Sequence, residues 1–597
     1  MIIVGSGISG LTTGSLLSQL GYRVVVLESS STAGGQCSTF ERAGFEFDSG
    51  LSAVTGMGRW QFGRRVMDRV TGGAVEWRAP MPDGQPFDCC KAGAQTLNDD
   101  ATGGPTPAFR FTADKSANKR LLKERFPDAK DQACIDQFFR SVSVARFLLV
   151  PWFLIKLLPR RSLREFLSRR LGGILGRYLS RTTADHLRQY TSNTALIGVL
   201  TYNYASLGMP PGQSSWLCQC SSSPLSSRSP PSYPVGGPSF IPLAACELIR
   251  RNGGLVFSDC KVERLLFDDN TDRGFSLLER SNVCWGVVVS GHKLYAKHVV
   301  CANGFRQSML KLVPPRHRAR LGDFPNALEF FDGVAPSSWS SSTTIITAND
   351  DGSYDSVDEP AVPVPRPKQT PRDKSGVGPS TSFLRLHVGL TGSSASHGLP
   401  ASDLWLFPSW DHDADDRRAA VNREAPAPAV RISSPSAKDP SWDQRWPKRS
   451  VVVVDSPCDF KWFAEWRHLP RKSRGAAYGK LKDWYTDRLL KVLYSEYPSL
   501  RDAVSTTSLS TPLSANTLRG VDRGEALGVQ HTASRMTTHA PDLAPGCDID
   551  GLYFAGQDIA PVGGIEGGLL AGLLCALTIC RAAIVQYTWI WITSRWW

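Results

Sequence analysis

The chain has 597 residues, of which 41% are hydrophobic and 21% are charged. This composition excludes a disordered chain, and the length predicts a large core divided between two or more interleaved domains. With 68 basic and 55 acidic residues, the net charge of +13 favours an anionic partner, either nucleic acid or a membrane surface. No helix-turn-helix, zinc-finger or RNP-type motif accompanies the charge, so no nucleic-acid partner is expected.

The 14 cysteines include no C-x-x-C pair, so no metal site is expected either.

The N-terminus predicts a phosphate-binding turn. The apolar run Ile2–Val4 is typical of a buried parallel strand, and three glycines follow it. Gly5 allows a sharp turn, Gly7 lets the backbone approach a pyrophosphate, and Gly10 lets the next helix pack closely on the sheet. The contacts expected here are Gly5, Ser6, Gly7, Ile8, Ser9 and Gly10.

An acidic residue completes the dinucleotide fingerprint. We expect a helix over Leu11–Leu20, ended by Gly21, and then a strand over Arg23–Leu27. This strand places Glu28 about 20 residues beyond the glycines, where a carboxylate accepts the ribose hydroxyls. Because the acid disfavours a 2'-phosphate at this position, the bound nucleotide is expected to be FAD or NAD rather than NADP.

A second glycine-rich loop after Glu28 favours FAD. Flavoproteins with a glutathione-reductase type of FAD domain have such a loop, whereas nicotinamide dehydrogenases do not need one. The alternation over 44–50 that follows is strand-like and ends in a glycine, and a plain turn with a hairpin is the simpler interpretation. The additional contacts expected here are Gly34, Gly35, Gln36, Cys37 and Gly50.

A third glycine-rich stretch lies near the C-terminus. A strand over Leu552–Phe554 ends in a turn, and a second turn over 561–568 opens an apolar helix over Leu569–Ile584. The positive end of a helix stabilises the negative charge of reduced flavin. Close helix packing alone is the alternative explanation of these glycines. The contacts expected here are Gly556, Asp558, Gly567 and Gly568.

The middle of the chain predicts a β-rich block beside the nucleotide domain. Its expected strands are 255–257, 262–267, 283–288 and 299–304. In flavoproteins of this class, a residue at the position of Val262 typically holds the adenine edge through its backbone. Plain sheet packing would give the same side chain.

Two segments have the composition of membrane-binding elements. The apolar run Phe147–Ile155 is too short to cross a bilayer, and seven basic residues follow it, namely Lys156, Arg160, Arg161, Arg164, Arg169, Arg170 and Arg177. Such a segment suits insertion into one leaflet beside anionic head groups. A buried helix with a solvated basic face is the equal alternative. The tail 586–597 is rich in tryptophan, as interfacial segments are.

The predicted fold class is α/β, with a discontinuous FAD-binding Rossmann-like domain of the glutathione-reductase type and an interleaved α+β substrate domain. Residues 1–110, 232–330 and 541–585 are assigned to the FAD domain. The other expected segments are a helical substrate- or membrane-facing part (111–217), a Ser/Pro-rich loop (218–231), a disordered insertion (337–380), the substrate domain (381–540) and the aromatic tail (586–597).

Several of these motifs together resemble the retinol saturases (all-trans-retinol 13,14-reductases), within the wider carotenoid isomerase and phytoene desaturase group of flavoproteins. The similar stretches are 34–40, 44–50, 233–237, 301–305, 435–450, 462–466, 555–558 and 570–575. The stretch 435–450 is the most specific, because it lies outside the FAD fold. The replaced segment 218–231 and the insertion after Ser337 depart from the family pattern.

The resemblance implies an FAD-dependent oxidoreductase that saturates a C=C bond of a lipophilic polyene, retinol or a carotenoid. It also implies NAD(P)H as the electron donor. The implied location is the endoplasmic reticulum or another internal membrane. The catalytic residues stay unassigned, although Asp558 and Glu566 are the acids nearest the flavin motifs. Trp405, Phe407 and Trp410 either line the substrate channel or belong to the core. A carotenoid isomerase or desaturase, and a non-catalytic flavin- or lipid-binding membrane protein, are the alternatives.

Overall fold

The computed structural model describes residues 1–82, 84–93, 108–158, 160–227, 229–267, 283–318, 377–584 and 587, and not the side chains of 171–177. The predicted insertion 337–380 therefore lies outside the described residues except for 377–380. Of the predicted aromatic tail, the structure describes Tyr587 alone.

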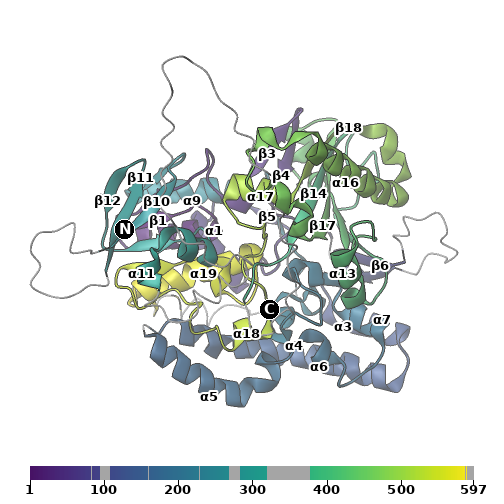
Figure 1. The fold of residues 1–597 in the computed structure, drawn as a ribbon. Helices are drawn as coiled ribbons and strands as arrows, with labels where there is room; N and C mark the ends of the chain where they lie inside the picture. The colour runs from purple at the N-terminus through teal and green to yellow at the C-terminus, as the bar shows by residue number, and fades with distance from the viewer. Residues whose placement is uncertain are drawn as a thin grey trace, which may run out of the picture.

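A parallel five-stranded sheet brings the two ends of the chain together (Figure 1). Its strands pair in parallel, and most of their side chains are buried, as expected of a sheet covered by helices on its faces. In sheet order the strands are β19 (Leu552–Phe554), β13 (Val299–Cys301), β1 (Ile2–Val4), β2 (Val25–Leu27) and β9 (Leu255–Phe257).

Glycines let two helices from opposite ends of the chain pack closely. Helix α1 (Ile8–Gln19) contacts α9 (Phe240–Arg251) and the C-terminal helix α19 (Gly564–Ile579). A Cβ atom on Gly568 would lie 2.4 Å from Ile8 Cγ2, and one on Gly572 would lie 2.5 Å from the carbonyl oxygen of Ser9. The predicted discontinuous Rossmann-like domain is therefore confirmed, with α19 beginning five residues earlier than expected.

A seven-stranded mixed sheet forms the second unit. Two of its strands come from the first 111 residues: β6 pairs in parallel with β15, and β7 pairs antiparallel with β6 and buries its two phenylalanines. The expected FAD segment 1–110 thus contains part of the second sheet. In sheet order the strands are β18 (Val504–Ser510), β14 (Ser382–Thr391), β17 (Arg449–Cys458), β16 (Val430–Ser433), β15 (Asp403–Phe407), β6 (Asp88–Ala92) and β7 (Phe109–Phe111).

Smaller elements complete the two units. The remaining strands are β3 (Thr39–Arg42), β4 (Phe45–Asp48), β5 (Trp77–Arg78), β8 (Tyr233–Pro234), β10 (Val262–Phe267), β11 (Cys284–Val289) and β12 (His292–Tyr295). The longer remaining helices are α2 (Phe62–Thr71), α3 (Lys115–Arg125), α4 (Ala129–Lys156), α5 (Arg161–Leu179), α13 (His412–Val421) and α16 (Gly475–Glu496). The shorter ones are α6 (Thr183–Leu187), α7 (Thr194–Leu200), α8 (Trp216–Ser222), α10 (Phe305–Gln307), α11 (Pro315–Arg318), α14 (Pro435–Lys438), α15 (Trp442–Arg445), α17 (Pro512–Arg519) and α18 (Ala533–Met536).

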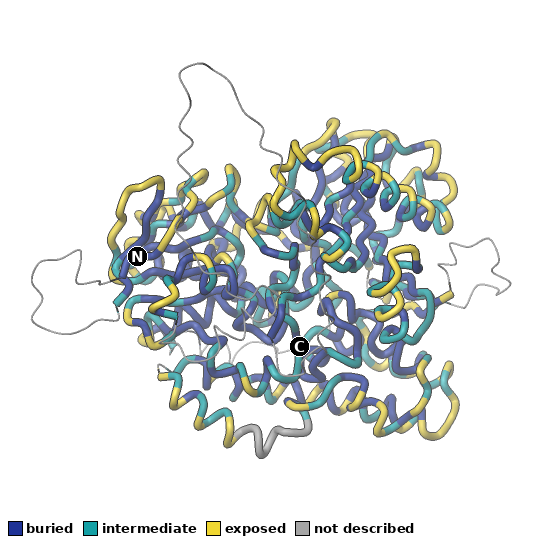
Figure 2. Tube along the Cα trace, viewed as in Figure 1, coloured by how far each residue is buried: buried dark blue, intermediate teal, exposed yellow. Residues whose placement is uncertain are grey.

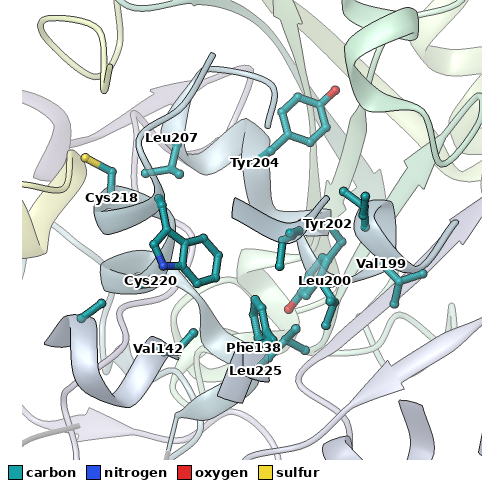
Figure 3. Close-up of a cluster of buried hydrophobic side chains, with 14 of the residues drawn as sticks. Phe138, Val142, Val199, Leu200, Tyr202, Tyr204, Leu207, Cys218, Cys220 and Leu225 are labelled. Atoms are coloured by element: carbon teal, nitrogen blue, oxygen red, sulfur yellow. The ribbon is translucent and has the colours of Figure 1, made fainter. Parts of the chain in front are cut away.

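The segment 218–231 is not the plain loop that its serines and prolines predicted. It begins inside α8, which packs on α4, and the side chains of Trp216, Cys218 and Cys220 are fully buried (Figure 3). The sequence did not predict this short helix, because seven residues are too few to establish a helical period and the serines that follow are typical of a loop.

The apolar run Phe147–Ile155 is the last third of the 28-residue helix α4. By length and composition α4 is apolar enough to cross a membrane, but 44% of its most apolar window is buried inside the protein. Two of the expected basic surface residues are also buried. Lys156 donates to the carbonyl oxygen of Ala540 (3.0 Å), and Arg164 donates to that of Pro541 (2.9 Å). The exposed side of α4 and α5 lies at one end of the molecule (Figures 1 and 2).

Candidate cofactor and active site

A cavity of about 1190 Å³ lies between the two sheets. It exceeds the usual range for a single small-molecule site, roughly 300–1,000 Å³, so it has room for a dinucleotide and a second ligand. Most of the predicted contacts line it, namely Gly5, Gly7, Ile8, Ser9, Glu28, Gly35, Gln36, Cys37, Gly50, Gly556, Asp558 and Gly568. The others, Ser6, Gly10, Gly34, Val262 and Gly567, are not part of this lining.

The geometry of the N-terminal turn fits a pyrophosphate. Gly5 has a φ of +98°, which favours glycine. A Cβ atom on Gly7 would meet nothing within 4 Å and would occupy cavity space instead. A Cβ atom on Gly10 would lie 2.1 Å from the carbonyl oxygen of Gly5. The turn therefore leaves open space next to the first backbone N–H groups of α1, where an anion binds.

Glu28 is ionised at the end of β2. Burial alone would raise its pKa, but hydrogen bonds from Ser6 and Ser30 hold the pKa below its ordinary value. Its Oε2 accepts from the backbone N–H (2.9 Å) and hydroxyl (2.6 Å) of Ser6, and its Oε1 accepts from the N–H of Ser30 (2.8 Å). Ser6 therefore contributes by orienting this carboxylate, which lines the cavity as a ribose acceptor should.

The second glycine loop lies against the first. Gly34 has a φ of +121°, and its N–H donates to the hydroxyl of Ser6 (3.1 Å). A Cβ atom on Gly35 would lie 3.3 Å from the Cα of Gly7. Two backbone segments that are 28 residues apart thus meet at the same anion-binding corner, as the FAD interpretation predicts.

The C-terminal turn is held from behind by an arginine that the sequence analysis did not identify. Arg535 is 1% exposed, and its guanidinium donates to four backbone carbonyls, those of Val529 (2.7 Å), Gln557 (3.0 Å), Asp558 (3.0 Å) and Ala560 (2.6 Å). No local motif marks this residue, because its partners lie before and after it in separate turns.

The carboxylate of Asp558 links two other loops to the C-terminal turn. Its Oδ1 accepts from the N–H of Val529 and its Oδ2 from the N–H of Phe305, both at 2.7 Å.

Glu566, in the first turn of α19, has a different set of partners from Asp558. Its carboxylate accepts from the hydroxyl of Thr55 (2.7 Å), and burial raises the pKa of Glu566 above its usual range. Burial therefore favours the protonated form of Glu566, as it does for Glu525, a second carboxyl that lines the cavity with a raised pKa.

The hairpin β3–β4 ends at the cavity and is clamped by the stretch 435–450. Arg445 pairs with Glu46 (2.5 Å), and Trp442 packs in one core with Phe45 and Phe47. Arg449 donates to the carbonyl of Gly44. The most specific part of the sequence resemblance thus holds in place the strand that leads into Gly50.

Asp48, at the end of this hairpin, is buried and accepts from the hydroxyl of Tyr233 (2.6 Å). Burial raises its pKa from 3.8 to about 7, so the folded state binds the proton more tightly than the unfolded state. Between these two values the free energy of unfolding falls as pH rises.

We predict that Asp48→Asn removes this fall, which is on the order of 1 kcal/mol per pH unit across the window. Denaturant titrations between pH 4 and pH 7, in buffers of equal ionic strength, measure it. The control is Asp68→Asn, which alters a partly exposed pair with Arg64. An unchanged pH slope in Asp48→Asn would contradict the assignment.

The structure also shows where Val262 and the three candidate channel aromatics lie. Val262 is 7% exposed and pairs with Val289, and the backbone N–H of Cys260, two residues earlier, donates to the backbone carbonyl of Glu28 (2.7 Å). Of the three candidate channel aromatics, Trp405 lines the cavity and also belongs to the helical core, with which Phe407 and Trp410 pack.

Comparison with known proteins agrees with this geometry. Residues 3–70 match the NAD(P)-binding Rossmann-like domain family. The all-trans-retinol 13,14-reductase of Macaca fascicularis is 26% identical, over 97% of this chain and 85% of its own length. A protein of Danio rerio named inactive all-trans-retinol 13,14-reductase is 25% identical over the same shares. Cyclohexylamine oxidase from Brevibacterium oxydans has the same fold, with a TM-score of 0.54 at 14% identity, covering 98% of this chain and 99% of its own.

The fold and the site define a protein built on a Rossmann-like dinucleotide-binding domain. Over 97% of its length the chain is similar, at 26–27% identity, to all-trans-retinol 13,14-reductases, the group that its motifs resemble.

Proposed function

We propose that the chain binds FAD and saturates one C=C bond of a polyene isoprenoid, as the name of its relatives implies. One observation carries the proposal: the N-terminal and C-terminal glycine turns line a single cavity whose opposite wall is the second sheet. The cavity volume of about 1190 Å³ supports binding of a polyene beside the dinucleotide.

When bound and reduced, FAD would supply the hydride that adds to one alkene carbon. The chain's own contribution is to hold the polyene rigidly and to deliver a proton to the neighbouring carbon. We assign that proton to Glu566, because its carboxyl lines the cavity at the C-terminal glycine turn and burial raises its pKa, which favours the protonated form. Thr55 orients the carboxyl through its hydroxyl and its N–H (3.1 Å).

Each turnover consumes two electrons, so a reductant is required. The proposed reductant is NAD(P)H. It would reach the flavin through the cavity, because we identify no second glycine fingerprint in the sequence for a separate nicotinamide domain.

The test is to reduce the flavin-loaded protein without oxygen, add all-trans-retinol and analyse the product by mass spectrometry. A gain of two hydrogen atoms supports saturation, and Glu566→Gln is expected to keep the flavin but lower the rate about 100-fold or more. An isomer of unchanged mass indicates an isomerase. Unreacted retinol beside fully reduced flavin would reject the proposal and favour the non-catalytic alternative, for which the inactive relative is a precedent.

A membrane surface is the proposed partner of helices α4 and α5. Five large apolar side chains are exposed on them, namely Val144 (38%), Phe147 (73%), Leu154 (59%), Leu163 (42%) and Phe166 (55%). Arg160 and Arg170 are exposed nearby, and an apolar face with basic neighbours suits the interface of one leaflet.

We predict that Phe147→Asp with Phe166→Asp lowers partitioning onto anionic vesicles at least tenfold, because each change removes an apolar contact and adds a repelled charge. Cosedimentation with vesicles measures this. Phe240→Asp with Leu243→Asp, at exposed positions on α9, is the matched control. Equal loss in both double variants would contradict a membrane-binding role of this face.

A further inference from the structure

One wall of the cavity is unusually rich in positive charge. It is formed by the N-terminal part of α16 and the segment before it, together with α17 and β3. We call it the cationic wall, and its residues are Arg42, Arg471, Lys472, Arg474, Lys482 and Arg519, all of which line the cavity.

The cationic wall has no carboxylate partners among the described residues. Its recorded hydrogen bonds go to neutral groups, from Arg42 to the hydroxyl of Ser508 (2.8 Å) and from Arg519 to the carbonyl of Ser49 (3.2 Å). The cations also crowd one another, since burial and then Arg42 and Arg471 lower the pKa of Lys482.

In the neighbouring wall of the cavity, by contrast, arginines are paired with a carboxylate. There Arg385 and Arg431 share the carboxylate of Asp455, with Arg385 at 2.6 Å. Among the described residues, no member of the cationic wall thus forms an ion pair, although the same cavity pairs other arginines with a carboxylate.

Arg474 is the buried member of the wall. It is 6% exposed, its Nη2 donates to the hydroxyl of Thr517 (2.7 Å), and its Nε has no partner among the described groups. It directly precedes α16, whose first turn contains no acidic residue. A buried guanidinium N–H and the first N–H groups of a long helix therefore both lack an acceptor, and an anion would satisfy them.

The position of the wall favours an anion that arrives from water. In Figure 1, α16 and α17 lie at the opposite end of the molecule from α5, which carries part of the apolar face assigned to the membrane. Arg471 and Lys472 are exposed, so the wall is open to solvent. A lipid head group in the same membrane would not reach it.

We propose that the cationic wall binds the phosphate groups of a water-soluble ligand, and that this ligand is the nicotinamide dinucleotide that reduces the flavin. The inference rests on the proposed function, which requires a reductant to approach a flavin in this cavity. Closely spaced arginines and lysines bind phosphate oxygens through charge-assisted hydrogen bonds. The wall lies apart in sequence from the Gly5–Gly10 turn that serves the phosphates of FAD.

The test measures binding of inorganic pyrophosphate to the purified protein by titration calorimetry, with NADPH and NADH as competitors. We expect Arg471→Glu with Lys482→Glu to weaken pyrophosphate binding about tenfold or more and to retain the flavin. The matched control, Lys480→Glu with Lys491→Glu, makes the same charge change on α16 outside the cavity lining and leaves binding unchanged.

Equal affinity in all three proteins, or no pyrophosphate binding, would overturn the site. Loss of flavin from the cavity variant would reassign the wall to FAD and overturn it as well. Pyrophosphate binding that neither dinucleotide displaces overturns the identity of the ligand, and displacement by phosphatidylglycerol vesicles would replace it with a lipid head group. A colourless protein whose pyrophosphate binding still depends on the wall would refute the proposed function but support the anion site.

Discussion

Gly7→Val is expected to yield a folded protein that binds no flavin. Gly7 has a φ of −60°, which suits any residue, and a Cβ atom there would touch nothing within 4 Å. A valine side chain would instead occupy the space that the pyrophosphate needs beside α1. The stability cost is that of a poorer helix N-cap, about 1 kcal/mol, whereas FAD affinity falls on the order of 100-fold or more.

The measurement is the flavin absorbance per chain after gel filtration, combined with circular dichroism to establish folding. Gly479→Ala is the matched control, because a Cβ atom on Gly479 also meets nothing within 4 Å and the residue also lines the cavity. A yellow Gly7→Val protein with the flavin content of the parent would contradict the assignment of this turn.

Arg535→Met is expected to cause the largest loss of stability among single changes at the site. It leaves four backbone carbonyls, those of the half-buried Gln557 and of the buried Val529, Asp558 and Ala560, without their charged donor. The expected cost is about 3–5 kcal/mol of unfolding free energy, accompanied by weaker flavin binding because the C-terminal turn is no longer fixed.

Chemical denaturation followed by tryptophan fluorescence measures the change for Arg535→Met. The exposed Arg250→Met on α9 is the control and should stay within about 0.5 kcal/mol of the parent. If Arg535→Met were as stable as the parent and kept its flavin, Arg535 would not support the turn.

The parts that could be predicted from the sequence are those whose signals are local. Glycines at fixed spacing between a strand and a helix predicted β1, α1 and the corner where Gly7 meets Gly35. The resemblance added the stretch 435–450, and the structure gives it a physical role as the clamp on the hairpin that carries Asp48.

The parts that could not be predicted depend on contacts between distant segments. Lys156 and Arg164 look like surface residues, but the carbonyls of the segment 540–546 bury them, a pairing of residues almost 400 positions apart. Arg535 depends on turns that become adjacent only in the folded protein. The cationic wall combines residues of β3 with residues of α16 and α17. These elements lie more than 400 positions apart in the sequence, so no local pattern indicates that they meet.

The most direct test of the account is to count the cofactor in the full-length protein. Heat-released nucleotide is identified by mass spectrometry and quantified against protein concentration. The account predicts one FAD per chain, together with a yellow spectrum that dithionite bleaches. A well-folded but colourless chain that takes up no added FAD would contradict it.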